Sequence, residues 1–168
     1  CTPTTLVAKG VSGTPAFSSD GKYVSFAGGY VSVAGGAVHR VASPQLVWSP
    51  ARTMLAYATR DGAIDLLIPG RRPRQIVAQS VGAGTPSFSP NGKTLVFPGR
   101  GRALYAVSVT GGTPRLLAGV AGPAQPMPFG FSPDGRYFLF HVAEGASLAS
   151  DGMPLVAVSL ATGKETTI

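Results

Sequence analysis

A short motif that occurs four times places the strongest constraint on how this chain folds. Each copy consists of an aromatic residue, Ser, usually Pro, Asp or Asn, Gly, and a basic residue. The copies begin at Phe17, Trp48, Phe88 and Phe131, so successive starts lie 31, 40 and 43 residues apart. The second copy departs from the pattern, because Ala51-Arg52 stands where Asp-Gly is expected. A period of about 40 residues is typical of repeat arrays and propellers.

The residues of the motif suit a tight turn between two strands. Pro fixes φ at about −65°, and Asp-Gly or Asn-Gly supplies the positions that need a positive φ. A short apolar run follows every copy, at 23–26, 54–57, 94–97 and 137–140. Further runs follow at 104–109 and 155–160, and shorter ones at 74–77 and 115–117. Each unit therefore contains about four short strands, as one propeller blade does.

The sequence thus predicts an all-β fold, a β-propeller of about four four-stranded antiparallel blades. We expect blades at about 14–43, 44–79, 84–118 and 126–168, preceded by a tether and an outer strand in 1–13. The 168 residues include 23 Gly and 15 Pro, and only 12% are charged. This composition favours turns over long helices. No apolar run reaches the ~18–20 residues that a membrane-spanning helix needs.

The motif and its Thr-Pro lead-in, at Thr14-Pro15 and Thr85-Pro86, resemble the WD-repeat-like units of TolB-type β-propellers. Similar repeats form the gating propellers of prolyl-oligopeptidase-like hydrolases. Members of this family usually have six or more blades, so four blades imply a small closed ring or an open arc. We favour the open arc, whose end blades need a partner. In a closed ring Leu6–Lys9 would complete the last blade, although Glu165–Ile168 already fits that outer strand.

The first residue, Cys1, is the only cysteine of the chain. A bacterial lipoprotein begins with Cys once its signal peptide is removed, and the polar Thr2-Pro3-Thr4-Thr5 would suit a tether. A fragment boundary that falls on a cysteine explains the observation equally well. The lipoprotein interpretation predicts acylation of Cys1 and a periplasmic or extracytoplasmic location in the bacterial cell envelope. A single cysteine excludes an internal disulfide and a cysteine-based zinc site.

The formal net charge of +7 is expected to lie mainly on one face of the propeller. Turns between the first and second strands and between the third and fourth strands share that face. The densest basic group there is Arg71, Arg72 and Arg74, which we predict to contact a partner. Such a face attracts anionic lipid headgroups or an acidic protein surface. The alternative is that these residues only solvate the turns.

Two further segments are candidate partner contacts. Arg100 and Arg102 fall in a turn on the opposite face, where acidic residues balance the charge. The connection 142–153 is longer than most hairpin loops and includes Leu148 and Met153, which are suited to docking on a partner. A disordered insertion of small residues is the alternative for this connection. No recognition helix or aromatic-interleaved basic strip accompanies the charge, so we expect no nucleic-acid partner.

Candidate catalytic groups are sparse. The two histidines, His39 and His141, are too few for a histidine-only zinc site, and no Gly-x-Ser-x-Gly elbow is present. The serines and aspartates of the repeated motif are explained by turn structure. The sequence therefore predicts no enzyme activity, no metal and no cofactor.

The expected function is that of a non-catalytic interaction or scaffold protein. It would be an extracytoplasmic lipoprotein or an extrinsic subunit of a bacterial membrane protein complex. The low charge supports burial against protein partners, because a free surface usually carries about 25–35% charged residues. The alternative is a gating, substrate-selecting propeller fragment of a prolyl-oligopeptidase-like hydrolase.

Overall fold

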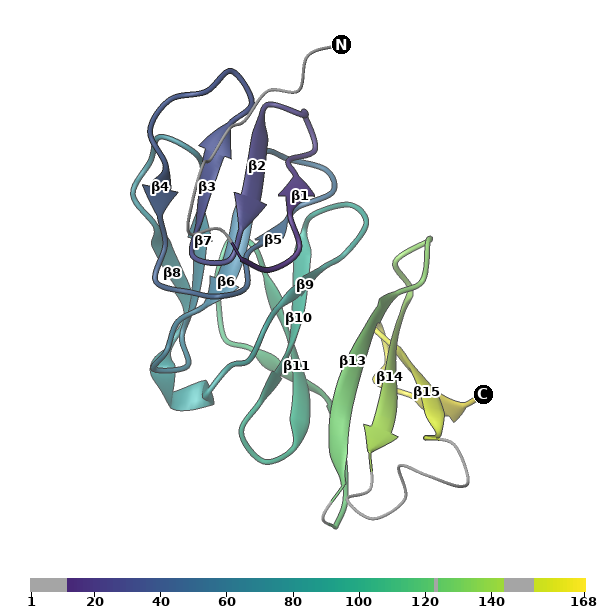
Figure 1. The fold of residues 1–168 in the computed structure, drawn as a ribbon. Coiled ribbons are helices and arrows are strands. Elements are labelled where there is room, and N and C mark those ends of the chain that lie inside the picture. Colours follow the sequence, from purple (N-terminus) through teal and green to yellow (C-terminus); the bar gives the residue numbers. More distant parts are fainter. Residues whose placement is uncertain (1–11, 123, 144–152) are drawn as a thin grey trace.

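The computed structural model describes residues 12–122, 124–143 and 153–168, which form four four-stranded antiparallel sheets (Figure 1). The first blade contains β1 (Ala16–Phe17), β2 (Tyr23–Phe26), β3 (Gly29–Ser32) and β4 (His39–Arg40). The second contains β5 (Val47–Trp48), β6 (Leu55–Ala58), β7 (Ile64–Leu67) and β8 (Arg74–Val77). The third contains β9 (Ser87–Phe88), β10 (Thr94–Gly99), β11 (Ala103–Ser108) and β12 (Arg115–Gly119). The fourth contains β13 (Gln125–Phe131), β14 (Tyr137–Ala143), β15 (Leu155–Ser159) and β16 (Glu165–Thr167).

These sheets confirm the predicted fold class, because strands pair in chain order within each sheet, as they do in a propeller blade. The inner strands β1, β5, β9 and β13 lie next to one another in turn, so the blades follow each other around an arc. One short 3-10 turn, η1 (Gln79–Val81), lies between the second and third blades. The first and fourth blades stand at the two ends (Figure 1). In the part of the chain that is described, no helix has the length and hydropathy of a membrane crossing.

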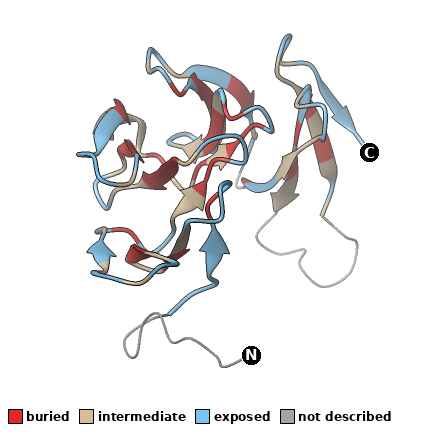
Figure 2. Ribbon diagram, turned by 90° about the horizontal axis from the view of Figure 1, so that it is seen from above, coloured by how far each residue is buried: buried red, intermediate tan, exposed pale blue. Residues whose placement is uncertain are grey.

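The core lies between the blades. We call the side of a blade that faces the preceding blade its leading face, and the other side its trailing face. The first and second blades enclose Tyr30, Trp48, Leu55, Tyr57 and Leu67. The second and third enclose Met54, Ala56, Ile64, Leu66, Ile76, Phe88, Leu95, Phe97 and Val107. The third and fourth enclose Val96, Leu104, Ala106, Leu117, Phe138, Phe140, Val156 and Val158. Figure 2 shows the buried residues concentrated where neighbouring blades meet.

No core cluster of the described residues joins the first and fourth blades. The fourth sheet already contains its own outer strand, β16, at the position expected for Glu165–Ile168. The segment Leu6–Lys9, the other candidate for that position, lies outside the described residues. The four blades therefore form an arc with two ends.

The repeated motif forms the turn between the first two strands of a blade. In the first copy, the Ser18 hydroxyl donates to Asp20 Oδ1 at 2.6 Å and accepts from the Tyr23 amide at 3.0 Å. The Lys22 amide also donates to Asp20, and Gly21 has a φ of 69°. The Ser18 hydroxyl lowers the pKa of Asp20, and Ser132 does the same for the exposed Asp134 in the fourth copy. The side chains of these serines and aspartates thus make hydrogen bonds that stabilise the turns.

Candidate functional site

Most basic side chains gather on one rim of the arc, which we call the basic rim. It carries the turns between the first and second strands and between the third and fourth strands of each blade. Its basic residues are Lys22, Arg52, Arg71, Arg72, Arg74, Lys93, Arg115, Arg136 and Lys164. Within the described residues one ion pair forms, between Arg136 and Asp134 at 3.6 Å, and both side chains are exposed. The positive charge of this rim is therefore largely uncompensated by carboxylates.

A pocket of about 240 Å³ opens on the basic rim at the turn between β7 and β8. We call it the arginine pocket; its lining residues are Met54, Leu66, Ile68, Arg71, Arg72 and Arg74. The turn reverses through Gly70, which has a φ of 80°, and the Arg71 amide donates to the Ile68 carbonyl at 2.9 Å. The pocket thus combines an apolar floor with a rim of guanidinium groups. Arg71, Arg72 and Arg74, predicted together from the sequence, lie together in the structure.

Arg74 has a role that the sequence did not reveal. Its guanidinium donates to the carbonyls of Val109, at 2.6 Å, and Thr110, at 3.1 Å, both in the third blade. Arg115, at the start of β12, makes the equivalent contact: it donates a hydrogen bond to the Leu160 carbonyl of the fourth blade. Each arginine thereby links the outer strand of one blade to the next blade. The side chain of Arg74 is held as a wall of the pocket. Arg71 and Arg72, by contrast, are exposed.

A second hollow, of about 400 Å³, lies on the other side of Arg71, between the first and second blades. Its lining includes Tyr30, His39, Arg40 and Tyr57. The His39 ring stacks on Tyr30 with a centroid distance of 4.8 Å, so this histidine is a packing residue. Arg71 borders both hollows, so it lies between the arginine pocket and the hollow that Tyr30 and Tyr57 line.

Two titratable groups beside this hollow were not predicted from the sequence. The Tyr57 hydroxyl donates to Asp65 Oδ2 at 3.3 Å across the β6–β7 pair. Burial, followed by the charge of Asp65, raises the pKa of Tyr57 to about 12. Burial also raises the pKa of Asp65. Only the cross-strand register of Tyr57 and Asp65 brings them together, so their spacing in the sequence carries no signal of the pair.

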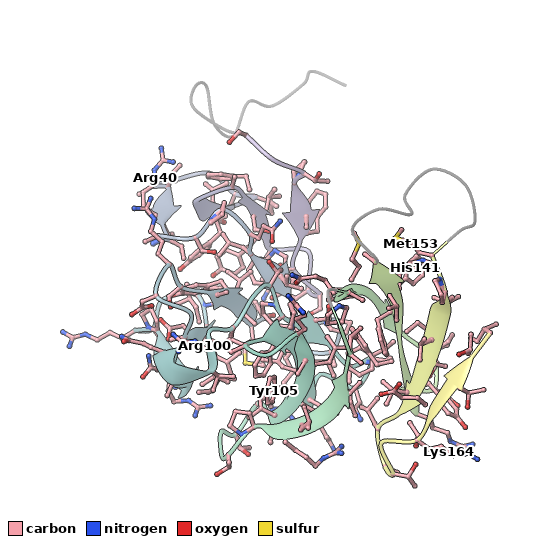
Figure 3. The ribbon with its side chains drawn as sticks, turned by 90° about the horizontal axis from the view of Figure 1, so that it is seen from below. Arg40, Arg100, Tyr105, His141, Met153 and Lys164 are labelled. Carbon is pink, nitrogen blue, oxygen red and sulfur yellow. The ribbon has the colours of Figure 1, made fainter. Side chains whose placement is uncertain are left out.

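The remaining predicted contact residues do not join the arginine pocket. Arg100 and Arg102 lie in the β10–β11 turn, on the opposite rim, where Arg102 donates to the Gly122 carbonyl. The carbonyl oxygen of Met153 lies 3.2 Å from His141 Nδ1 in the fourth blade, far from Arg100 (Figure 3). Cys1 and Leu148 fall outside the described residues. Among those that are described, no group of three or more His, Cys, Asp or Glu side chains could hold a metal.

Comparison with known proteins identifies a fold. No family model and no curated protein matches the chain. A TolB candidate from Agrobacterium tumefaciens is 22% identical, with a TM-score of 0.64 over 94% of this chain and 61% of that one. Hydrazine synthase from Kuenenia stuttgartiensis is 17% identical, with a TM-score of 0.67 over 92% of this chain and 53% of that one. The Cps50 (Swd1) β-propeller domain from Myceliophteria thermophila is 16% identical, with a TM-score of 0.71 over 98% of this chain and 57% of that one.

These similarities show that the chain has a β-propeller fold like those of TolB and WD40-like propellers. They show the fold alone, because all three identities are below a quarter. The chain spans between about half and three fifths of the length of each of these proteins. Fold does not determine function, so a function must be argued from the surface of this chain.

Proposed function

We propose that this propeller is a non-catalytic interaction module that binds an acidic protein segment at its arginine pocket. One observation carries the proposal. Arg71 and Arg72 are exposed beside an apolar floor, and neither has a carboxylate partner among the described residues. Two uncompensated guanidinium groups next to Ile68, a side chain that is 44% exposed, form a surface suited to a partner that brings both charge and apolar contact.

The chemistry of arginine supports a protein carboxylate as the ligand. A guanidinium group can donate two parallel hydrogen bonds to one carboxylate, and arginine is enriched at protein interfaces. The uncompensated charge of the basic rim would also speed the approach of an acidic partner. The apolar floor would accept one apolar side chain of that partner, which would exclude water from the ion pairs.

A matched pair of charge reversals tests this site. The probe is a labelled peptide with four Asp or Glu residues around a single Leu, and fluorescence anisotropy at 150 mM NaCl measures its binding. We expect the double variant Arg71→Glu/Arg72→Glu to weaken binding at least tenfold. Lys22→Glu/Lys164→Glu makes the same charge change in other turns of the basic rim, and we expect it to weaken binding less than threefold. Equal losses in both variants, or no binding by the unaltered protein, would contradict the proposal.

The finer proposal is that the module works in a bacterial cell envelope, as a lipoprotein or an extrinsic subunit of a membrane protein complex. Cys1, followed by a short polar stretch, supports this placement. Stable anchoring would require several acyl chains, because one chain gives only marginal membrane binding. Intact mass spectrometry of the protein from its native membrane tests the idea. We expect the mass of a diacylglycerol and a fatty acid on Cys1, and a free thiol there would rule out the lipoprotein.

A further inference from the structure

The junction between the first and second blades lacks a contact that the other two junctions share. Arg74 and Arg115 donate hydrogen bonds from the outer strand of one blade to carbonyls of the next blade. Both occupy the same position of the repeat, where each pairs with the third strand of its own blade. The register of the first sheet places His39 at this position, paired with Tyr30. The His39 ring stacks on Tyr30 within the first blade, so no arginine crosses this junction from that position.

The hollow of about 400 Å³ described above lies at this junction, and we call it the aromatic hollow. Tyr30, on the trailing face of the first blade, and Tyr57, on the leading face of the second, form buried walls that are 3% and 5% exposed. His39, Arg40 and Arg71 also line the hollow and are exposed. Figure 3 shows Arg40 at the outer side of the first blade. The aromatic hollow thus combines buried phenol rings with exposed guanidinium groups.

The charges of the aromatic hollow exclude a cationic occupant. None of its lining residues is acidic, and neither Arg40 nor Arg71 has a carboxylate partner among the described residues. Asp65, which accepts the hydrogen bond of the Tyr57 hydroxyl, is not part of the lining. Burial raises the pKa of Tyr30, and it raises the pKa of Tyr57 to about 12, so both phenols are uncharged at neutral pH. A lysine or arginine side chain would therefore meet only like charge here.

An aromatic side chain suits these walls. Aromatic rings attract one another in offset and edge-to-face arrangements, and a guanidinium group stacks on the face of a ring. Buried aromatic residues that fill a pocket also contribute a large share of the affinity of many protein interfaces. An aromatic residue within an acidic segment would satisfy both the rings and the uncompensated charge of the aromatic hollow.

Arg71 connects the aromatic hollow to the arginine pocket, because it lines both. A segment bound at the arginine pocket therefore has the aromatic hollow beside it. We propose that the acidic segment bound there also carries an aromatic side chain, which enters the aromatic hollow. This inference rests on the proposed function and adds a second determinant of specificity to it. The first blade then takes part in binding, although it supplies no residue of the arginine pocket.

Peptides that differ in one side chain test the inference. The acidic probe with a single Leu is extended by Tyr-Gly at its amino end or by Gly-Tyr at its carboxyl end, and the matched peptides carry Ala in place of Tyr. Fluorescence anisotropy at 150 mM NaCl measures the four dissociation constants. We expect one of the two Tyr peptides to bind at least fivefold more tightly than its Ala counterpart.

Two matched variants assign this preference to the aromatic hollow. Arg40 lines the aromatic hollow alone, and Arg72 lines the arginine pocket alone. We expect Arg40→Gln to reduce the preference for Tyr over Ala to less than twofold and to change the affinity for the Ala peptide less than twofold. Arg72→Gln removes the same charge and should weaken both peptides at least threefold, with the preference for Tyr retained. The urea midpoint of each variant verifies that the fold is kept.

The outcomes separate the two proposals. Equal binding of the Tyr and Ala peptides, or a preference that persists in Arg40→Gln, would overturn the aromatic hollow as a binding site. The proposed function would still stand if the Ala peptide binds and Arg72→Gln weakens it. A Tyr peptide that binds while its Ala counterpart does not, with no effect of Arg72→Gln, would instead contradict the proposed function. Absence of binding by all four peptides would overturn both.

Discussion

Replacing the same aromatic residue of the motif in two different blades separates local structure from blade stacking. Phe88 and Phe17 both end the inner strand of a blade and both pair with the second strand, at Leu95 and Val24. Phe88 is 8% exposed between the second and third blades, whereas Phe17 is 68% exposed. The substitution to Ala removes the same atoms at both positions. Any difference in stability must therefore come from the neighbouring blade.

The structure sets the expected magnitudes. Truncation of a buried Phe to Ala typically destabilises a protein by about 3–5 kcal/mol, from lost burial and the cavity left behind. We expect Phe88→Ala to fall in this range and to lower the melting temperature by roughly 10 °C, at about 2–4 °C per kcal/mol for a chain of this size. Phe17→Ala changes an exposed side chain, so its effect should stay within about 0.5 kcal/mol.

Urea unfolding followed by the fluorescence of Trp48, the only tryptophan, measures both variants with one reporter. Phe88→Leu keeps a large apolar side chain and should lose only about 1 kcal/mol, which provides a variant that folds in any case. If Phe17→Ala is as destabilising as Phe88→Ala, the inference that blades stabilise each other through these aromatic residues is wrong.

Five further substitutions test local contacts, each by urea unfolding. Arg74→Met should lose about 1 kcal/mol, because it removes the hydrogen bonds to the third blade, whereas Arg72→Met should be nearly neutral. Asp65→Asn should raise stability at pH 7, because burial raises the pKa of this carboxyl and disfavours its charged form. That gain should vanish as the pH falls below about 3.8, where Asp65 is protonated in both states. Gly101→Ala, with a φ of 75° and open space, should lose roughly 1–2 kcal/mol. Gly62→Ala should lose more, because its Cβ would also lie 2.7 Å from backbone.

The sequence predicted the features that depend on neighbouring residues in the chain. The predicted strands at 23–26 and 74–77 match the bounds of β2 and β8. The Ser–Asp–Gly turns are also local, since the hydrogen bonds that join Ser18 and Asp20 to each other and to the Lys22 and Tyr23 amides span no more than five residues. Patterns of this kind can be read from a single repeat.

Contacts between blades could not be read in this way. Phe17 and Phe88 carry the same motif, and only the presence or absence of a preceding blade separates an exposed residue from a buried one. Arg74 looked like a surface charge because its partners, the carbonyls of Val109 and Thr110, lie 35 and 36 residues away. Every residue has a backbone carbonyl, so the sequence does not indicate which carbonyls accept a hydrogen bond from a distant arginine. The contact between Arg74 and the third blade is therefore found only in the structure.

The arginine pocket shows why this distinction matters for function. Met54 and Leu66, its buried floor, pack against Phe88 and other residues of the third blade. Arg74 is held by the carbonyls of the same blade. The pocket is therefore a property of two stacked blades, although the second blade supplies every lining residue. Binding and stacking must be linked, because a ligand that needs the assembled pocket stabilises the stacked state. Phe88→Ala should thus weaken binding of the acidic peptide although Phe88 does not line the pocket, and the peptide should in turn raise the urea midpoint of the unaltered protein.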